Sequence, residues 1–163
     1  MDNDFKIREY NGSDLEGMLP VFNYFAEHGD AVYTDMPLSL NRFKKLIEQV
    51  KIGLVLENGD KIIGFGYISA YKPYPNFDFT GVLTYFIMPQ YTGIGLGTRL
   101  FDELIKRGRQ AGINNFLAHI SSMNEQSLNF HKKKGFVTVG EFKNVAVKNS
   151  RLFDIIWVQK QYK

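Results

Sequence analysis

Three glycines fall within five residues at Gly93-Ile94-Gly95-Leu96-Gly97, between an apolar stretch (83–88) and an amphipathic one (98–111). Glycine has no Cβ, so the chain can turn sharply there and a ligand can approach its main chain closely. Successive N–H groups can then point at one anion, and the N-terminus of the following helix adds its positive end. A strand, a glycine turn and a helix in this order predict a phosphate-binding loop.

Composition limits the classes of protein to which the chain can belong. Its 163 residues are most simply one domain over 1–163, and 44% hydrophobic with 23% charged residues is typical of globular proteins. The net charge of +3 suits a phosphorylated ligand but is too small to indicate nucleic acid. The absence of cysteine excludes disulfides, thiolate metal sites and a cysteine nucleophile, and it suits a reducing cytoplasm.

Targeting and metal-binding signals are not found in the sequence. No basic-then-apolar segment resembles a signal peptide, and no apolar run approaches membrane-spanning length. The three histidines and the carboxylates lack metal-ligand spacing, so no metal is expected. We therefore expect a cytoplasmic protein with neither a membrane nor a nucleic acid as partner.

Hydrophobic periodicity predicts the order of the elements. Asn58-Gly59-Asp60 is typical of a tight hairpin turn, and Ser13-Asp14-Leu15-Glu16 has the pattern of a helix capping box. Strands are predicted at 5–10, 52–57, 61–70, 82–88, 115–121, 136–142 and 152–159, and helices from Ser13, from Ser39, over 98–111 and over 124–134. This order indicates an α/β fold with a mixed sheet and helices on both faces.

The loop over 71–79 is unusually apolar for a solvent-facing segment. It carries two prolines among four aromatic residues, Tyr71, Tyr74, Phe77 and Phe79. These side chains are either a small hydrophobic cluster under the loop or a wall of a substrate site, and the pattern leaves both open.

Two common phosphate-binding motifs do not fit the glycine turn. A P-loop requires Gly-Lys-Ser/Thr, whereas this chain has Gly97-Thr98-Arg99. A dinucleotide site requires G-x-G-x-x-G followed by an acidic residue on the next strand. Here the third glycine comes too early, and residues 117–120 contain no acid.

Two motifs, in the right order, resemble the GNAT acetyltransferase superfamily. Residues 92–97 resemble its pyrophosphate signature, (Gln/Arg)-x-x-Gly-x-(Gly/Ala), with Thr92 replacing the usual Gln or Arg. Residues 124–136 resemble its Asn-x-x-(Ser/Ala)-x-x-x-(Tyr/His)-x-x-x-Gly-(Phe/Tyr) helix, with His131 at the Tyr/His position. Histidine there is similar to the phosphinothricin and methionine-sulfoximine acetyltransferase branch, and the resemblance covers essentially the whole chain.

The resemblance implies a GNAT acyl-CoA N-acyltransferase fold. Its sheet is mixed and mostly antiparallel, and two parallel strands, here 82–88 and 115–121, splay apart between helices on both faces. Acetyl-CoA, the co-substrate, lies in that gap, and a backbone N–H near Phe86 or Ile87 would polarise the thioester. The implied contacts are Phe86, Ile87, Met88, Thr92, Gly93, Ile94, Gly95, Leu96, Gly97, Thr98, Asn124 and Ser127.

The implied reaction is direct attack of a primary amine on the thioester in a ternary complex. The acceptor is expected to be a small molecule, either amino-acid-like or an apolar amine, bound by the aromatic residues Tyr33, Tyr71, Tyr74 and Phe77. His131 shares a helix face with Asn124 and Ser127, and its pKa near neutrality suits protonation of the departing thiolate. The alternative for His131 is a half-buried structural histidine, and His28 and His119 are interpreted as structural.

The sequence departs from the family pattern in ways that leave alternative functions open. The phosphinothricin-like branch usually has Glu where this chain has Val82, so the general base is unassigned and an acyl-CoA-binding module without turnover stays open. Acetylation of a protein or peptide is a third reading, which the lid-like loop over 71–79 disfavours. Members of the branch are commonly dimers, so a homodimer is expected, with Phe153 and Trp157 either at its interface or in the core.

Overall fold

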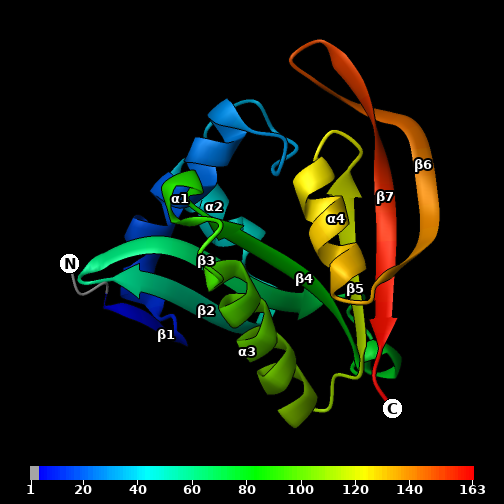
Figure 1. The fold of residues 1–163 in the computed structure, drawn as a ribbon, viewed down its shortest axis with the longest axis horizontal. Helices are drawn as coiled ribbons and strands as arrows, with labels where there is room; N and C mark the ends of the chain where they lie inside the picture. The colour runs from blue at the N-terminus through cyan, green and yellow to red at the C-terminus, as the bar shows by residue number, and fades with distance from the viewer. Residues whose placement is uncertain (1–3) are drawn as a thin grey trace.

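The computed structural model describes residues 4–163 and places its strands in one seven-stranded sheet (Figure 1). The strands are β1 (Phe5–Glu9), β2 (Val50–Asn58), β3 (Lys61–Ala70), β4 (Thr80–Ile87), β5 (Asn115–Ser121), β6 (Val137–Lys148) and β7 (Arg151–Gln161). Their order is β1-β2-β3-β4-β5-β7-β6, and neighbours are antiparallel except β4 and β5, which are parallel. The predicted mixed, mostly antiparallel sheet is confirmed.

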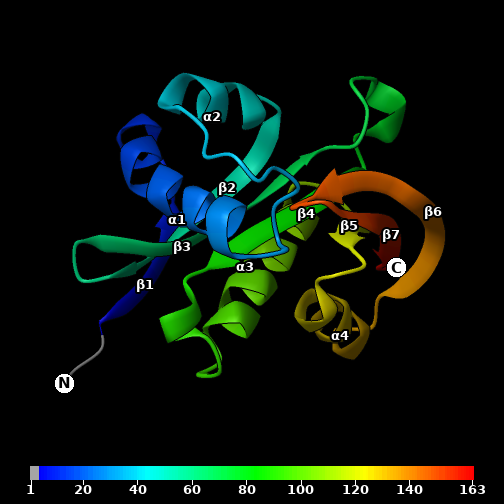
Figure 2. The same cartoon turned by 90° about the horizontal axis from the view of Figure 1, so that it is seen from above.

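Helices cover both faces of the sheet, as Figure 2 shows, with α1 and α2 on one side and α3 and α4 on the other. They are α1 (Leu15–His28), α2 (Leu40–Leu46), α3 (Leu96–Gln110) and α4 (Glu125–Lys133), with short 3-10 turns η1 (Gly12–Asp14), η2 (Pro75–Phe77) and η3 (Pro89–Tyr91). On α3, Leu96, Leu100 and Leu104 are buried at a spacing of one helical turn. Each face therefore has its own hydrophobic core.

The parallel strands β4 and β5 are paired over three residues only. The paired positions are Thr80 with Asn115, Gly81 with Phe116 and Val82 with Leu117. Beyond them the two strands diverge, which can be followed in Figure 1, while β4 continues its pairing with β3 and β5 with β7. The splayed parallel strands that the resemblance implied are thus present, and they open a gap inside the sheet.

The first helix begins differently from the prediction. The capping box belongs to η1 rather than α1: Asn11 Oδ1 accepts the Ser13 N–H at 2.9 Å, and the Asp14 carboxylate accepts the Asn11 N–H at 2.7 Å. Asp14 is available for this because Arg8 fixes its carboxylate from the neighbouring strand. The prediction of a Ser13–Glu16 box was therefore wrong by two residues.

Strand β6 is longer than predicted and reaches Lys148 instead of ending at Phe142. A bulge interrupts its pairing with β7 between Phe142 and Ala146, and Asn144 adopts a positive φ of 50° there. Its N–H donates to Asp154 Oδ1 at 2.7 Å, which holds the bulge in place. The bulge breaks the alternation of residues on which the sequence prediction depended.

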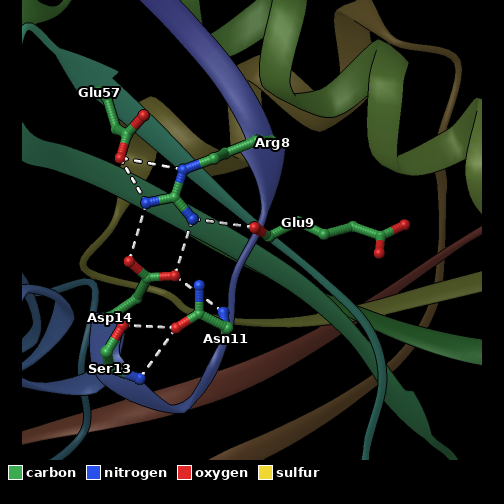
Figure 3. A network of polar contacts seen from close by, with 6 residues as sticks. All are labelled: Arg8, Glu9, Asn11, Ser13, Asp14 and Glu57. Carbon is green, nitrogen blue, oxygen red and sulfur yellow. Dashed lines mark hydrogen bonds and ion pairs between the residues drawn. The ribbon is translucent and has the colours of Figure 1, made fainter.

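An ion network joins β1, η1 and β2 (Figure 3). Arg8 donates to both carboxylate oxygens of Asp14 at 2.8 Å and also to Glu57. Asp14 is only 8% exposed, and its hydrogen bonds with Arg8 hold the pKa of its carboxyl below the ordinary value. A bidentate pair of this kind fixes the geometry of both side chains.

Asp14→Asn is expected to lower the free energy of unfolding at pH 7 by about 2 kcal/mol, because Arg8 loses a charge-assisted partner. A carboxyl with a lowered pKa stabilises the fold above its ordinary pKa, and this contribution disappears as the pH falls through the folded-state value. Urea unfolding at pH 7 and at pH 3 measures both effects, and the difference from wild type should shrink at pH 3. Glu27→Gln, at an exposed carboxylate of α1, is the control; an equal loss there would contradict the prediction.

Candidate active site

A cavity of about 610 Å³ lies where β4 and β5 part. Successive side chains of a strand point to opposite faces of a sheet. On β4 the cavity is lined by Thr84, which shares a face with α1 and α2, and also by Tyr85, which packs toward α3 and α4. The cavity therefore reaches both faces of the sheet through the gap between the two strands.

On the α3/α4 side the lining contains Tyr85, Asn124, Ser127 and His131. Asn124 is the N-cap of α4, and its Oδ1 accepts the Ser127 N–H at 3.1 Å. His131 is 2% exposed; its Nδ1 lies 2.8 Å from the Ser127 carbonyl oxygen and its Nε2 lies 2.7 Å from Tyr85 Oη. A carbonyl can only accept, so Nδ1 carries the proton, and Nε2 accepts the hydrogen bond that the Tyr85 hydroxyl donates.

Burial sets the protonation of this pair. It lowers the pKa of His131, which a hydrogen bond to the Ser127 carbonyl partly opposes, and it raises the pKa of Tyr85 well above its ordinary value. At neutral pH the pair is therefore a neutral imidazole beside a neutral phenol. Tyr85 Oη can deliver a proton to a group bound beside it, and His131 Nε2, which accepts its hydrogen bond, holds the hydroxyl in place.

On the α1/α2 side the cavity is lined by Tyr33, Thr34, Gln49, Tyr67, Ser69 and His119. Tyr33 Oη lies 2.6 Å from His119 Nδ1, and the Trp157 ring centroid is 4.9 Å from that of His119. The His119 side chain is exposed toward the cavity, but these rings displace much of the surrounding water, and burial lowers its pKa. His119, interpreted above as structural, is thus part of the candidate site.

The cavity is uncharged. Among the described residues, those that form its lining include no Asp, Glu, Lys or Arg, and Val82 lines it where the resembling branch usually has Glu. Its titratable groups are three tyrosines, Tyr33, Tyr67 and Tyr85, and two histidines, His119 and His131. A molecule bound here meets aromatic rings, hydroxyls and imidazoles.

The glycine loop lies outside this cavity, beyond the end of β4 and at the start of α3. Gly93 and Gly95 have φ angles of +79° and +86°, and a Cβ at either position would meet no heavy atom within 4 Å. Residues 92–95 are exposed, and in the described chain the amides of residues 93–98 donate to no protein acceptor. Free amides around an open space at a helix N-terminus fit a diphosphate group.

The main-chain amides of β4 that face the gap are not all those predicted to contact the coenzyme. Met88 donates its N–H to Ile63 O at 2.9 Å, so that amide faces β3. Amides along a strand alternate between its two edges, which turns Phe86 toward β3 as well and leaves those of Tyr85 and Ile87 facing the gap. The main-chain groups of Phe86 and Met88 are therefore turned away from the gap, whereas those of Tyr85 and Ile87 face it.

The predicted aromatic walls do not all reach the cavity. Tyr33 lines it, whereas Tyr71, Tyr74 and Phe77 lie outside the lining and are exposed. Phe77 contacts both Tyr71 and Tyr74, and Tyr71 also packs on Trp157 at 6.1 Å between ring centroids. The aromatic residues of the loop thus form a surface cluster rather than a wall of this cavity.

The segment that carries Tyr33 is fastened to the far end of the sheet by Lys148. This side chain is 2% exposed, and its Nζ donates to the carbonyls of Phe25, Gly29 and Val32 at 3.2, 2.6 and 2.7 Å. Phe25 and Gly29 lie at the C-terminus of α1, where a cation is favourable, and Val32 lies in the segment that follows. Burial lowers the pKa of Lys148. Lys148 on β6 thereby fixes the position of Tyr33 beside His119.

Two further properties concern the whole described chain. Along residues 4–163, no helix has the length and apolar character needed to cross a membrane. Over the same range, His, Asp and Glu side chains form no group of three or more that could hold a metal ion.

On β7, Phe153 is 2% exposed and packs on Tyr33, so it belongs to the core rather than to an interface.

The chain is similar in sequence to characterised acetyltransferases. It is 26% identical to the L-methionine sulfoximine/L-methionine sulfone acetyltransferase of Pseudomonas aeruginosa over 158 residues, covering 94% of this chain and 92% of that protein. It is also 26% identical to the phosphinothricin N-acetyltransferase of Alcaligenes faecalis, covering 94% of this chain and 81% of that protein.

The structure is similar to solved proteins as well. It matches yncA of Salmonella typhimurium, solved with its cofactor acetyl-CoA, at a TM-score of 0.86 and 25% identity, over 99% of this chain and 95% of that chain. Residues 19–136 match the Acetyltransferase (GNAT) family, and that span is more than half of the 163 residues. The chain therefore belongs to the GNAT family of acetyl-CoA-dependent acetyltransferases.

Proposed function

We propose that this acetyltransferase acetylates the primary amine of a small molecule. When bound, acetyl-CoA supplies the activated acyl group as a thioester. The observation that carries the proposal is the cavity through the β4–β5 gap, which a free strand edge and an open glycine loop adjoin. Its volume of about 610 Å³ lies within the range of small-molecule sites.

The residues present fit the coenzyme. The amides of Gly93, Ile94, Gly95, Leu96, Gly97 and Thr98 would hold the diphosphate, with Thr92 next to them in the chain, and Asn124 and Ser127 line the cavity. The amides of Tyr85 and Ile87 would bind the pantetheine arm and orient the acyl group, because an aimed main-chain donor stabilises charge developing on a carbonyl oxygen. Tyr85 Oη, backed by His131, would hold the proton for the departing sulfur.

The acceptor would enter from the α1/α2 side, where Tyr33 and Tyr67 form apolar walls. The relatives named above act on amino-acid-like compounds, but the described part of the chain places no cation in this lining to pair with an acceptor carboxylate. Burying an unpaired carboxylate is costly. An apolar amine without a carboxylate is therefore the acceptor class that this cavity favours.

The experiment pairs phenethylamine with phenylalanine, which differ by one carboxylate, and follows release of coenzyme A thiol. We expect kcat/KM for phenethylamine to exceed that for phenylalanine by about tenfold or more, as the cost of an unpaired buried charge requires. Calorimetry with acetyl-CoA alone is run in parallel. Binding without thiol release across a panel of amines would instead support an acyl-CoA-binding module.

The proposal extends to the assembly and the location of a single-domain enzyme. Strand β6 is at the edge of the sheet, and the β6–β7 hairpin exposes Val137, Val139, Phe142, Val145, Val147 and Leu152. An exposed apolar edge of this kind suits a partner of the same chain in a homodimer. A cytoplasmic location follows from the use of acetyl-CoA, an intracellular metabolite.

A further inference from the structure

We propose that His119, positioned by Tyr33, is the group that takes the proton from the acceptor ammonium. The inference rests on the proposed acetylation of a primary amine and assigns its missing base. Alkyl amines have a pKa near that of lysine, about 10.4, so they reach the enzyme protonated at pH 7. An ammonium nitrogen has no lone pair, and a proton must leave before the N–C bond forms.

The cavity offers few groups that can accept this proton. No carboxylate from residues 4–163 lines it, and the raised pKa values of Tyr33, Tyr67 and Tyr85 keep those phenols protonated at neutral pH. Both nitrogens of His131 are engaged, by the Ser127 carbonyl and by Tyr85, on the α3/α4 side. His119 is the remaining group that is basic near neutrality.

His119 also lies where an acceptor amine would approach the gap between β4 and β5. On β5 it lies two residues, about 7 Å, beyond Leu117, the last residue of that strand paired with β4. Leu117 pairs with Val82, and two residues further along their strands His119 and Thr84 both line the cavity, at the point where the gap opens. An amine entering from the α1/α2 side meets the imidazole before it reaches the strand edge.

The contacts of the ring prepare it for this role. Nδ1 is engaged by Tyr33 Oη at 2.6 Å, which leaves Nε2 for the acceptor. When the Nδ1–H group donates a hydrogen bond to Tyr33 Oη, the lone pair of Nε2 is available to accept a proton. Burial lowers the pKa of His119 and keeps the ring neutral, while the Trp157 ring at 4.9 Å stabilises the cation once it forms.

One N–H bond of the ammonium breaks, its electron pair stays on the amine nitrogen, and a new N–H bond forms at His119 Nε2. The amine nitrogen then forms the N–C bond as the C–S bond breaks; Tyr85 Oη gives its proton to the departing sulfur, which leaves as the thiol, and the second proton of the amine returns to Tyr85. His119 finally releases its proton to water, so that one proton is released for each amide formed.

The test compares His119→Gln with wild type on benzylamine and on aniline, whose nitrogen is already unprotonated at pH 7. Glutamine keeps a hydrogen bond to Tyr33 but cannot accept a proton. We expect kcat/KM for benzylamine at pH 7 to fall about tenfold, and that for aniline to change by less than about twofold. His28→Gln, at an exposed histidine of α1 outside the cavity, is the matched control.

The pH profile is the second readout. Besides Tyr33, the titratable groups around His119 are Tyr67 from β3 and, across the gap, Tyr85 and His131; Trp157 does not titrate. Wild-type kcat/KM for benzylamine should level off above the pKa of His119, whereas that of His119→Gln should keep rising with the free-amine fraction. Equal losses on both amines, or a variant profile that keeps the plateau, would overturn the role of His119. If wild type acetylates neither amine, the proposed function fails, and the role of His119 with it.

Discussion

Gly95→Val is expected to weaken acetyl-CoA binding by about 100-fold, which corresponds to about 2.7 kcal/mol. Gly95 has a φ of +86°, a region that β-branched residues avoid, and its Cβ would project into the space beside the free amides of the loop. Each hydrogen bond to a charged group contributes about 1.5–3 kcal/mol, so the loss of one or two accounts for the effect. Calorimetry with acetyl-CoA measures it.

Gly112→Val is a matched control at the other end of α3. Gly112 has a φ of +87° and, like Gly95, would place its Cβ in open space. The two glycines flank the 15 residues of α3, about 22 Å, so they share the backbone strain but not the ligand. We expect similar losses of thermal stability in both variants and a loss of affinity in Gly95→Val alone. Unchanged affinity in Gly95→Val would contradict the assignment of the loop.

The main elements of the fold were predictable because their signals are local. The hairpin between β2 and β3 follows from Asn58, Gly59 and Asp60, and Gly59 indeed has a φ of +58°. The buried stripe of α3 follows from the spacing of its leucines. The bulge at Asn144 and the cap at Asn11 were not predicted, since each depends on a side chain from a neighbouring strand.

The candidate site was predictable only in part, because its key contacts join distant residues. The glycine loop and the face of α4 are continuous in sequence, so their motifs could be identified. Tyr33 and His119, in contrast, are separated by 86 positions, and nothing near His119 distinguishes it from an ordinary strand residue. The sequence pattern indicates that Tyr85 is a core aromatic residue of a buried strand, and its hydrogen bond to His131 is seen only in the structure.

Tyr85→Phe is expected to lower kcat by about 100-fold while leaving the affinity for acetyl-CoA within about twofold of wild type. The change removes one hydroxyl, the group proposed to donate a proton to the departing sulfur, and keeps the ring that packs on Phe101 and Phe130. Stopped-flow or steady-state thiol release measures kcat, and calorimetry measures affinity. Tyr24→Phe, at a tyrosine of α1 outside the cavity lining, is the control and should retain wild-type kcat.

His131→Gln shows whether the two residues act as one unit. His131 Nε2 receives the Tyr85 hydrogen bond at 2.7 Å, and the ring is 2% exposed, so its contact with the reacting sulfur runs through Tyr85 Oη. Groups that act in series lose their effect together. The Tyr85→Phe/His131→Gln double variant should therefore have about the kcat of the slower single variant.

A multiplicative loss in the double variant would instead mean that Tyr85 and His131 contribute independently, and the proposal that they act in series would be wrong.

The direction of the pH dependence gives a further constraint. Because burial lowers the pKa of His131 and raises that of Tyr85, the neutral pair persists through the neutral range and fails only when acid protonates His131. With aniline, which needs no proton transfer to His119, wild-type kcat should therefore fall toward acidic pH, and His131→Gln should lose that acidic limb.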